Sequence, residues 1–286
     1  MSRPIRLIAI DIDGTLLDTK VQLSQENRAA LRRAHEAGIE IVLVTGRRHT
    51  FALPIAEKLG FDLCLISSNG AVTRSLQGEL FHQDLLPLPT ALKLCRRMAE
   101  YHDYMVLTFD REERGAIICE SHDHLYGVIQ RWMEKNSLYI DYISPIEKAL
   151  VTAPIQAMFC GPIELSKTML DKLEASDFRQ EFTVLRTQYE WRDLCIIDLL
   201  NAGCSKGHAL ERWCNHRGID RSDVMAIGDN YNDVEMLDFA GHPVIMQNAS
   251  EDLKQNGWTV TLHCDEHGVA AAIDQVLERN AAITNA

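Results

Sequence analysis

The sequence predicts an α/β fold, in which a doubly wound parallel sheet is interrupted by an inserted α+β domain. Strand-like apolar runs alternate with helical segments over the first eighty residues. Between about 85 and 190 this alternation gives way to adjacent strands and helices, and it returns from about 205 to the end. We therefore predict one domain formed by residues 1–84 and 191–286, and an inserted domain over 85–190.

The first portion predicts three buried strands, each a short apolar run of the kind found in parallel sheets. A helix between the first two strands has Ser24 as its expected N-cap and ends before Gly38. Asn69-Gly70 predicts a tight turn at the start of a hairpin. The expected strands are 7–10, 39–44 and 63–66, and the expected helices are 24–37 and 50–59.

The remaining elements follow from the same patterns of apolar spacing and helix ends. In the inserted domain we expect helices at 90–101, 125–135 and 164–174, and strands at 104–108, 116–119, 156–160 and 182–187. In the last portion we expect helices at 205–217, 233–239 and 269–277, and strands at 224–227, 244–246 and 260–262.

Composition narrows the possible partners. Hydrophobic residues make up 46% of the 286 residues, and the formal net charge is −12. A net acidic surface repels nucleic acid and anionic membranes, so we expect neither as a partner. No apolar leader precedes the first strand, and the eight cysteines show no CxxC spacing. These features favour a cytoplasmic protein with reduced thiols.

Two aspartates, Asp11 and Asp13, follow the first strand in the motif Asp-Ile-Asp-Gly-Thr. Two carboxylates this close repel each other in a partly buried site. A divalent cation relieves that repulsion, and carboxylate oxygens are ligands that Mg²⁺ prefers. The alternative is a solvated turn around an Asp-Gly step, but this longer motif after a buried strand is rarer than Asp-Gly alone.

A second polar motif, Thr45-Gly46-Arg47, follows the second strand. A hydroxyl and free backbone N–H groups at a helix start form an anion site, and Arg47 is able to add charge-assisted hydrogen bonds. A plain strand-to-helix turn with Thr45 as the N-cap explains the motif equally well when it is taken alone.

Two further motifs occur late in the chain. Lys206 opens a helix, where a positive charge interacts unfavourably with the helix dipole. That small cost is explained if Lys206 is directed at a bound phosphate and at Asp11. Asp229, Asn232 and Asp233 follow the strand at 224–227 and offer a second arm for a metal site. Taken alone, an exposed lysine and an Asx-rich loop are the ordinary interpretations.

The order of these motifs resembles the haloacid dehalogenase superfamily. Further stretches resemble its Cof-type phosphatase branch, and they are 68–71, 205–210, 235–237, 240–241, 246–249 and 268–270. This resemblance covers residues 1 to about 83 and about 191 to 286. It implies a Rossmann-like core with an α/β cap that sets substrate specificity. The middle region agrees with that cap only in length and position.

The resemblance also implies roles for the motif residues. Asp11 would be the nucleophile, Asp13 the general acid/base and Lys206 a catalytic cation. Thr45, Gly46, Arg47 and Asn232 would bind substrate phosphate. Mg²⁺ would be held by Asp11, Asp13 and Asp229, with Asp233 at the metal or orienting Lys206. The reaction would be hydrolysis of small phosphorylated metabolites, such as sugar phosphates, nucleotides or cofactor phosphates.

Two other functions fit the same fold. A sugar phosphomutase shares the first half-reaction, and retains a bisphosphorylated intermediate. A non-catalytic binding protein would be expected to lack Asp11, Asp13 or Lys206, and all three are present. The oligomeric state is not readable from the sequence.

Overall fold

The computed structural model describes residues 3–123, 125 and 127–284, and it divides the chain into two compact units. The first unit comprises residues up to Gln83 and from Ser205 onward, and the second comprises Asp84–Cys204. The outermost residues of the predicted first domain, 1–2 and 285–286, lie outside the described part, as does Tyr126 of the predicted helix 125–135. Among the described helices, none combines the length and apolar character that crossing a bilayer requires.

The first unit is built on an eight-stranded sheet, in the order β14-β13-β12-β1-β2-β3-β4-β5. The strands from β14 to β3 run parallel, and the last two join antiparallel as a hairpin. The strand bounds are β1 (Leu7–Ile10), β2 (Glu40–Val44), β3 (Cys64–Ser67), β4 (Val72–Ser75), β5 (Leu80–Gln83), β12 (Val224–Gly228), β13 (His242–Ile245) and β14 (Thr259–Val260).

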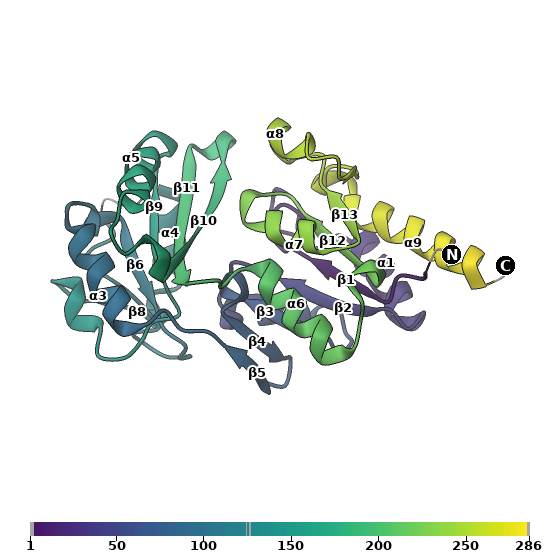
Figure 1. Ribbon diagram of the computed structural model, residues 1–286, viewed down its shortest axis with the longest axis horizontal. Coiled ribbons are helices and arrows are strands. Elements are labelled where there is room, and N and C mark those ends of the chain that lie inside the picture. The colour runs from purple at the N-terminus through teal and green to yellow at the C-terminus, as the bar shows by residue number, and fades with distance from the viewer. Residues whose placement is uncertain (1–2, 124, 126, 285–286) are drawn as a thin grey trace. The chain divides into compact units, whose positions relative to one another are not determined.

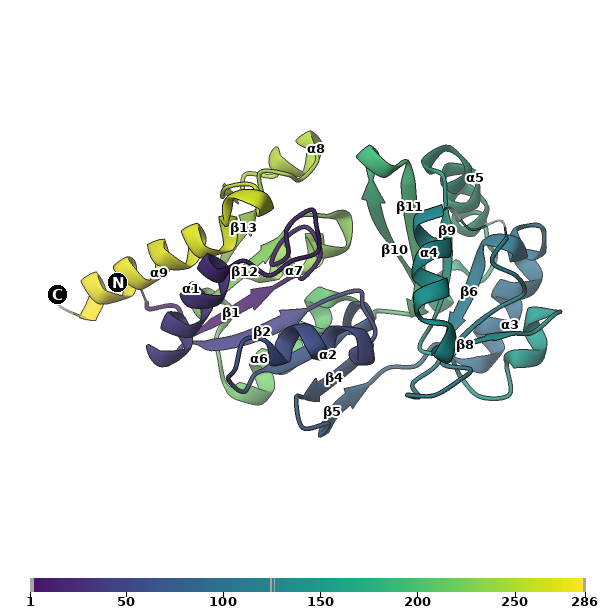
Figure 2. The same cartoon turned by 180° about the vertical axis from the view of Figure 1, so that it is seen from behind.

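Helices cover both faces of this sheet, as the doubly wound prediction requires (Figure 1, Figure 2). Ile8 and Ile10 pack in one apolar cluster with α1 (Gln25–Glu36), α2 (His49–Glu57) and α9 (Gly268–Thr284). Leu7 and Ala9 pack in a second cluster with α6 (Lys206–Arg217) and α7 (Val234–Phe239). Side chains of β1 therefore alternate between two buried faces, which explains its unbroken apolar run. The short α8 (Glu251–Lys254) follows β13.

The second unit contains a separate, mainly antiparallel sheet in the order β10-β11-β9-β6-β7-β8. One face packs against α3 (Leu88–Arg97) and α5 (Ile163–Glu174), and α4 (Gly127–Lys135) is the third helix of this unit. The strand bounds are β6 (Met105–Thr108), β7 (Ile117–Cys119), β8 (Ile140–Tyr142), β9 (Gln156–Gly161), β10 (Phe182–Tyr189) and β11 (Leu194–Asn201).

The structure corrects the second domain boundary. The sequence placed residues 191–204 in the first domain, whereas β11 pairs with both β10 and β9 in the second sheet. The short turn after β10, with Asp193 in the left-handed region, returns the chain directly alongside β10. The boundary therefore lies at 204, where Ser205 caps α6, and not at 190.

Candidate active site

The predicted motifs meet at one edge of the first sheet. Asp11 follows β1, Thr45 follows β2, Ser68 follows β3 and Asp229 follows β12. These strands are neighbours in the order β12-β1-β2-β3 and run parallel, so their carboxyl ends share an edge. Each of these four polar residues is buried.

Lys206 is fully buried between two carboxylates. Its Nζ donates to Asp11 Oδ1 and to Asp233 Oδ1, each at 2.6 Å. Burial alone would lower the pKa of Lys206, but the attraction of Asp11 and Asp233 raises that pKa well above its usual value. Lys206 is therefore a fixed cation, in contrast to the exposed lysine of the ordinary sequence interpretation.

The position of Lys206 follows from how tightly α6 packs. Ser205 is its N-cap and accepts a hydrogen bond from the His208 amide. A Cβ at Gly207 would lie 2.6 Å from backbone atoms of Glu235, so glycine lets α6 approach the start of α7. On its other side, a Cβ at Gly70 would lie 2.2 Å from the Ser205 carbonyl oxygen. The start of α6 therefore packs closely against both the Gly70 loop and the start of α7.

Asp11, Asp229 and Asp233 each place a carboxylate oxygen within 4.8 Å of the other two. Burial, followed by the charges of Asp233 and Asp13, raises the pKa of Asp11 to about 7, although Lys206 opposes the rise. Burial and the charges of Asp11 and Asp233 likewise raise the pKa of Asp229 well above its ordinary value. Carboxylates held this close in a buried site have the donor chemistry of a hard divalent cation site.

The three carboxylates are not equivalent. Asp233 uses Oδ1 for Lys206, and its Oδ2 accepts the amide N–H groups of Asp229 and Asn230 at 3.0 and 3.1 Å. Asp229 accepts at Oδ1 from the Thr15 hydroxyl, 3.0 Å away. Both oxygens of Asp233 therefore already have strong donors, while Asp11 and Asp229 keep lone pairs for a further ligand.

Gly14 brings the first loop against Asp229. Its φ is +79°, and a Cβ there would lie 2.4 Å from Asp229 Oδ2. Only glycine combines that backbone conformation with so close an approach. Asn248 holds the same loop, because its Nδ2 donates to the Gly14 carbonyl oxygen at 2.8 Å.

Asp13 and Arg47 form a bidentate ion pair at the half-exposed side of the site. Arg47 Nε donates to Asp13 Oδ2 at 2.6 Å, and Nη2 donates to Asp13 Oδ1 at 2.5 Å. The Arg47 amide also donates to Thr45 Oγ1 at 3.1 Å. The sequence predicted Arg47 as a phosphate-binding residue, and in this structure its guanidinium contacts Asp13.

The remaining predicted residues converge through Asn69. Asn232 Nδ2 donates to Asn69 Oδ1 at 2.9 Å, and a Cβ at Gly46 would lie 3.1 Å from that same oxygen. Ser68 and Asn69 both have positive φ, 49° and 53°, so this loop is held in an unfavourable conformation. The structure therefore brings all nine predicted site residues to one edge of the first sheet.

Sequence reasoning did not include Thr15, Asn69 and Asn248 among the site residues. Thr15 lies within the Asp-Ile-Asp-Gly-Thr motif, and Asn69 and Asn248 lie in stretches used only for the family resemblance. A polar residue in each loop that follows a parallel strand was the available signal.

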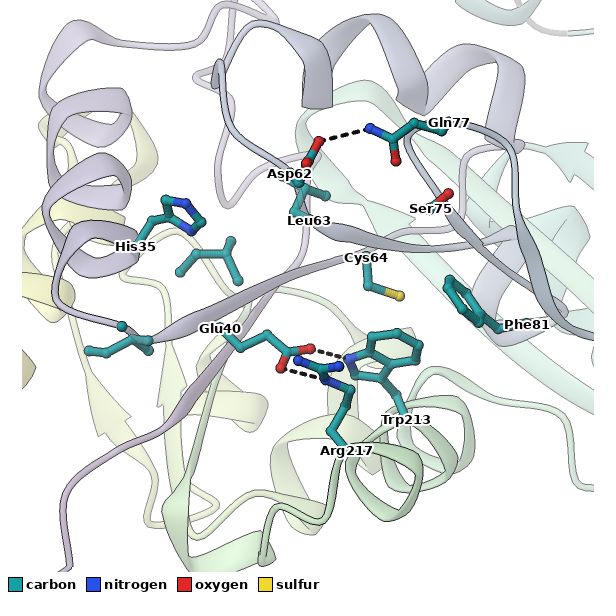
Figure 3. Close-up of a pocket in the computed structure, with 13 residues that line it drawn as sticks. His35, Glu40, Asp62, Leu63, Cys64, Ser75, Gln77, Phe81, Trp213 and Arg217 are labelled. Atoms are coloured by element: carbon teal, nitrogen blue, oxygen red, sulfur yellow. Dashed lines mark hydrogen bonds and ion pairs between the residues drawn. The ribbon is translucent and has the colours of Figure 1, made fainter.

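A cavity of about 400 Å³ lies elsewhere in the first unit (Figure 3). Glu40 and Cys64, which line it, are the first residues of β2 and β3, so the cavity is at the opposite strand ends from Asp11. Figure 3 shows the Glu40 carboxylate reaching Trp213 and Arg217 of α6, with Nε1–Oε1 and Nε–Oε2 distances of 2.6 and 2.9 Å. This cavity is not part of the candidate active site.

Comparisons with known proteins identify the family of this chain. Residues 8–273 match the model of a family described as haloacid dehalogenase-like hydrolase. Phosphatase YwpJ of Bacillus subtilis (strain 168) is 33% identical, over 96% of this chain and 100% of that protein. Pyridoxal phosphate phosphatase YbhA of Escherichia coli (strain K12) is 30% identical, over 87% of this chain and 90% of that protein.

Two solved structures have a similar fold and a related sequence. A haloacid dehalogenase-like hydrolase from B. subtilis has a TM-score of 0.79 and 29% identity, over 94% of this chain and 99% of that one. A second, from Bacteroides thetaiotaomicron, has a TM-score of 0.78 and 28% identity, over 95% and 99% of the two chains. The chain therefore belongs to the haloacid dehalogenase-like hydrolases, in their Cof-type branch, and is an enzyme that hydrolyses phosphoric monoesters.

Proposed function

We propose that this phosphatase hydrolyses small phosphorylated metabolites with Mg²⁺, through an aspartyl-phosphate formed on Asp11. The observation that carries the proposal is the buried Lys206, which contacts both Asp11 and Asp233 at 2.6 Å. A buried cation at a carboxylate is expensive to maintain as a purely structural feature. The buried charge of Lys206 is explained if Asp11 approaches an anionic phosphate during the reaction.

The residues present fit Mg²⁺. The buried oxygens of Asp11 and Asp229 are hard ligands with raised pKa values, so a divalent cation would favour their charged form. We propose that these side chains and the Asp13 backbone carbonyl hold the ion. When bound, Mg²⁺ offsets the repulsion between the Asp11 carboxylate and the phosphate oxygens. Asp233 would act mainly by positioning Lys206, because both of its oxygens already accept hydrogen bonds.

The proposed reaction has two steps. Asp11 attacks phosphorus, the bond to the leaving oxygen breaks, and Asp13 gives that oxygen a proton. Asp13 then takes a proton from the water that attacks phosphorus, which releases inorganic phosphate and restores Asp11. In the structure both oxygens of Asp13 accept hydrogen bonds from Arg47, so this bidentate contact must open when Asp13 carries the proton, and it forms again when Asp13 is a carboxylate.

The transferring phosphoryl group would be bound by a set of fixed donors around Asp11. We propose that these are the Thr45 hydroxyl, the Gly46 amide, Lys206 and the Asn232 amide. Thr45 and Asn232 are buried, and Asn232 is held by its hydrogen bond to Asn69. Donors that are fixed before the reaction stabilise developing charge without reorganisation.

We propose that the second unit, rather than the first, selects the substrate. The relatives match along almost the whole chain, yet their names differ in substrate, for example pyridoxal phosphate and 5-amino-6-(5-phospho-D-ribitylamino)uracil. The first unit contains the phosphate chemistry proposed above, which all phosphoric monoesters share. Residues 84–204 would then contact the parts of the substrate that differ from one phosphoric monoester to another.

The experiment that tests the proposal measures phosphate release from a panel of sugar phosphates, nucleotides and cofactor phosphates with Mg²⁺. We expect release from at least one small substrate, and none above background from the Asp11→Asn protein. Conversion of a sugar 1-phosphate to its 6-phosphate without free phosphate would identify a mutase. No turnover of any substrate would contradict the proposal.

We expect Mg²⁺ to stabilise the protein more at pH 8 than at pH 5. The folded-state pKa of Asp11 is raised from 3.8 to about 7, so its contribution to stability is present below pH 4 and is lost as the pH rises through 7. A bound cation opposes this loss of stability at pH 8. At pH 5, protons compete with the cation for the Asp11 carboxylate. At a Mg²⁺ concentration of about 100 times Kd, the gain is about 2.7 kcal/mol, or roughly 5–10 °C in Tm.

Thermal unfolding with Mg²⁺ or with a chelator at both pH values measures this effect. The matched control is Asp229→Asn, which removes one proposed ligand and should show little response to Mg²⁺ at pH 8. Equal Tm increases at pH 5 and pH 8, or a full increase in Asp229→Asn, would contradict the proposed ligands.

A further inference from the structure

A second group of potential metal ligands lies entirely within the second unit. His102 is in a 3-10 turn (Ala99–Tyr104), Glu120 directly follows β7, and Glu147 is in another 3-10 turn (Ile146–Ala149). Each residue places one ligand atom within 4.8 Å of the other two. None of the three takes part in the phosphatase chemistry proposed above.

Both ring nitrogens of His102 lie close to oxygen atoms that act as acceptors. Nε2 lies 2.8 Å from the Cys95 carbonyl oxygen, which only accepts, so Nε2 carries a proton. Nδ1 lies 3.0 Å from Glu120 Oε1. In the neutral imidazole, Nδ1 presents a lone pair to that carboxylate, and the contact requires a cation, either a second proton or a metal ion. An imidazole that donates its far N–H to a carbonyl is the usual arrangement of a metal-binding histidine.

Glu147 adds a second carboxylate that a single proton on His102 does not neutralise. Among the described residues, its Oε2 is shielded from solvent and has no hydrogen-bond partner. Glu147 as a whole is half-buried, but a shielded carboxylate oxygen without a donor is still unfavourable. A divalent cation would balance both glutamates and also meet the Nδ1 lone pair.

Glu120 is already fixed in place by neighbouring groups. The Ile146 amide donates to its Oε1 and the Ser144 hydroxyl donates to its Oε2, each at 2.8 Å. Such contacts orient carboxylate ligands in metal sites. They also bring the segment that contains Glu147 next to Glu120.

We propose that His102, Glu120 and Glu147 bind one divalent transition-metal cation, with Zn²⁺ as its representative. One imidazole and two carboxylates suit Zn²⁺, whereas Mg²⁺ prefers oxygen ligands alone. The site is distinct from the proposed Mg²⁺ site in its ligand type and in its unit. The ion joins three loops that are far apart in sequence and stabilises the second unit by binding only its folded form.

Zn²⁺ titration of the full-length Asp229→Asn protein tests this proposal. That background weakens the carboxylate cluster of the first unit, and the protein is first stripped of metal with a chelator. Calorimetry is expected to show one Zn²⁺ bound. Adding Glu147→Gln should weaken the affinity at least tenfold, as should His102→Gln. The control Glu164→Gln, at an exposed glutamate of the same unit, should leave it unchanged.

Visible absorption of the Co²⁺-substituted protein gives a second readout that does not depend on activity. We expect d–d bands in the Asp229→Asn protein, and their loss in Asp229→Asn/Glu147→Gln. Absence of Zn²⁺ binding, or equal affinity in all variants, would overturn the proposal. So would an affinity that falls with His263→Gln and not with Glu147→Gln, since His263, Cys264 and Asp265 form another candidate cluster.

Discussion

Replacing Asp11 with Asn is expected to lower kcat by at least about 10⁴-fold and to leave the protein as stable as before. An amide does not attack phosphorus, and loss of the nucleophile removes most of the catalysis in comparable hydrolases. The fold should tolerate the change, because burial already raises the pKa of Asp11 to about 7. The neutral Asn avoids that burial penalty, and Lys206 keeps its contact with Asp233.

Steady-state phosphate release measures the expected fall in kcat, and urea unfolding measures the expected stability. The free energy of unfolding should stay within about 1 kcal/mol of the original value. Asp274→Asn is a matched control, because Asp274 is a half-exposed aspartate paired with Arg33. Activity of Asp11→Asn within tenfold of the unmodified protein would exclude Asp11 as the nucleophile.

Replacing Lys206 with Met is expected to destabilise the metal-free protein by about 3–5 kcal/mol and to lower kcat by about 10²–10³-fold. The change leaves Asp11 and Asp233 buried at close range without the cation that both now contact. Stability should fall most at pH 8, above the raised pKa of Asp11 of about 7, and less at pH 5.

The double variant Lys206→Met/Asp233→Asn separates this electrostatic cause from simple loss of packing. If an unpaired buried charge is the cause, removing the Asp233 charge should recover much of the lost unfolding free energy. Activity should not return, because the cation at Asp11 is still missing. Lys167→Met, at an exposed lysine paired with Glu164, controls for the chemical change. A Lys206→Met protein of unchanged stability in chelator would contradict the arrangement described above.

The position of the site was predictable because parallel strands share one edge for their carboxyl ends. Asp11, Thr45 and Asp229 each directly follow an apolar strand, so their convergence follows from the strand order. The role of Lys206 was predicted from the family resemblance, whereas its position at the start of a helix alone did not predict its burial. The convergence of the strand ends depends on chain topology, which the apolar pattern determines.

Other features were not predictable, because they depend on side-chain conformation or long-range pairing. The Asp13–Arg47 contact requires a particular rotamer of a long side chain. Asn69 acquires its role through a left-handed backbone that faces Asn232, far away in sequence. Residues 191–204 were placed in the first domain and no strand was predicted at 194–201, because only the pairing with β10 shows that this segment belongs to the second sheet.

Trapping of the covalent intermediate tests the central claim most directly. The enzyme is mixed with an accepted phosphate ester and Mg²⁺, quenched within milliseconds, and treated with borohydride, which reduces an acyl phosphate on aspartate to homoserine. Mass spectrometry of the peptide that contains residues 7–16 should then show homoserine at position 11, and Asp13 unchanged. Steady turnover with no modification at Asp11, or with homoserine at position 13, would contradict the assignment of Asp11 as the nucleophile and Asp13 as the proton carrier.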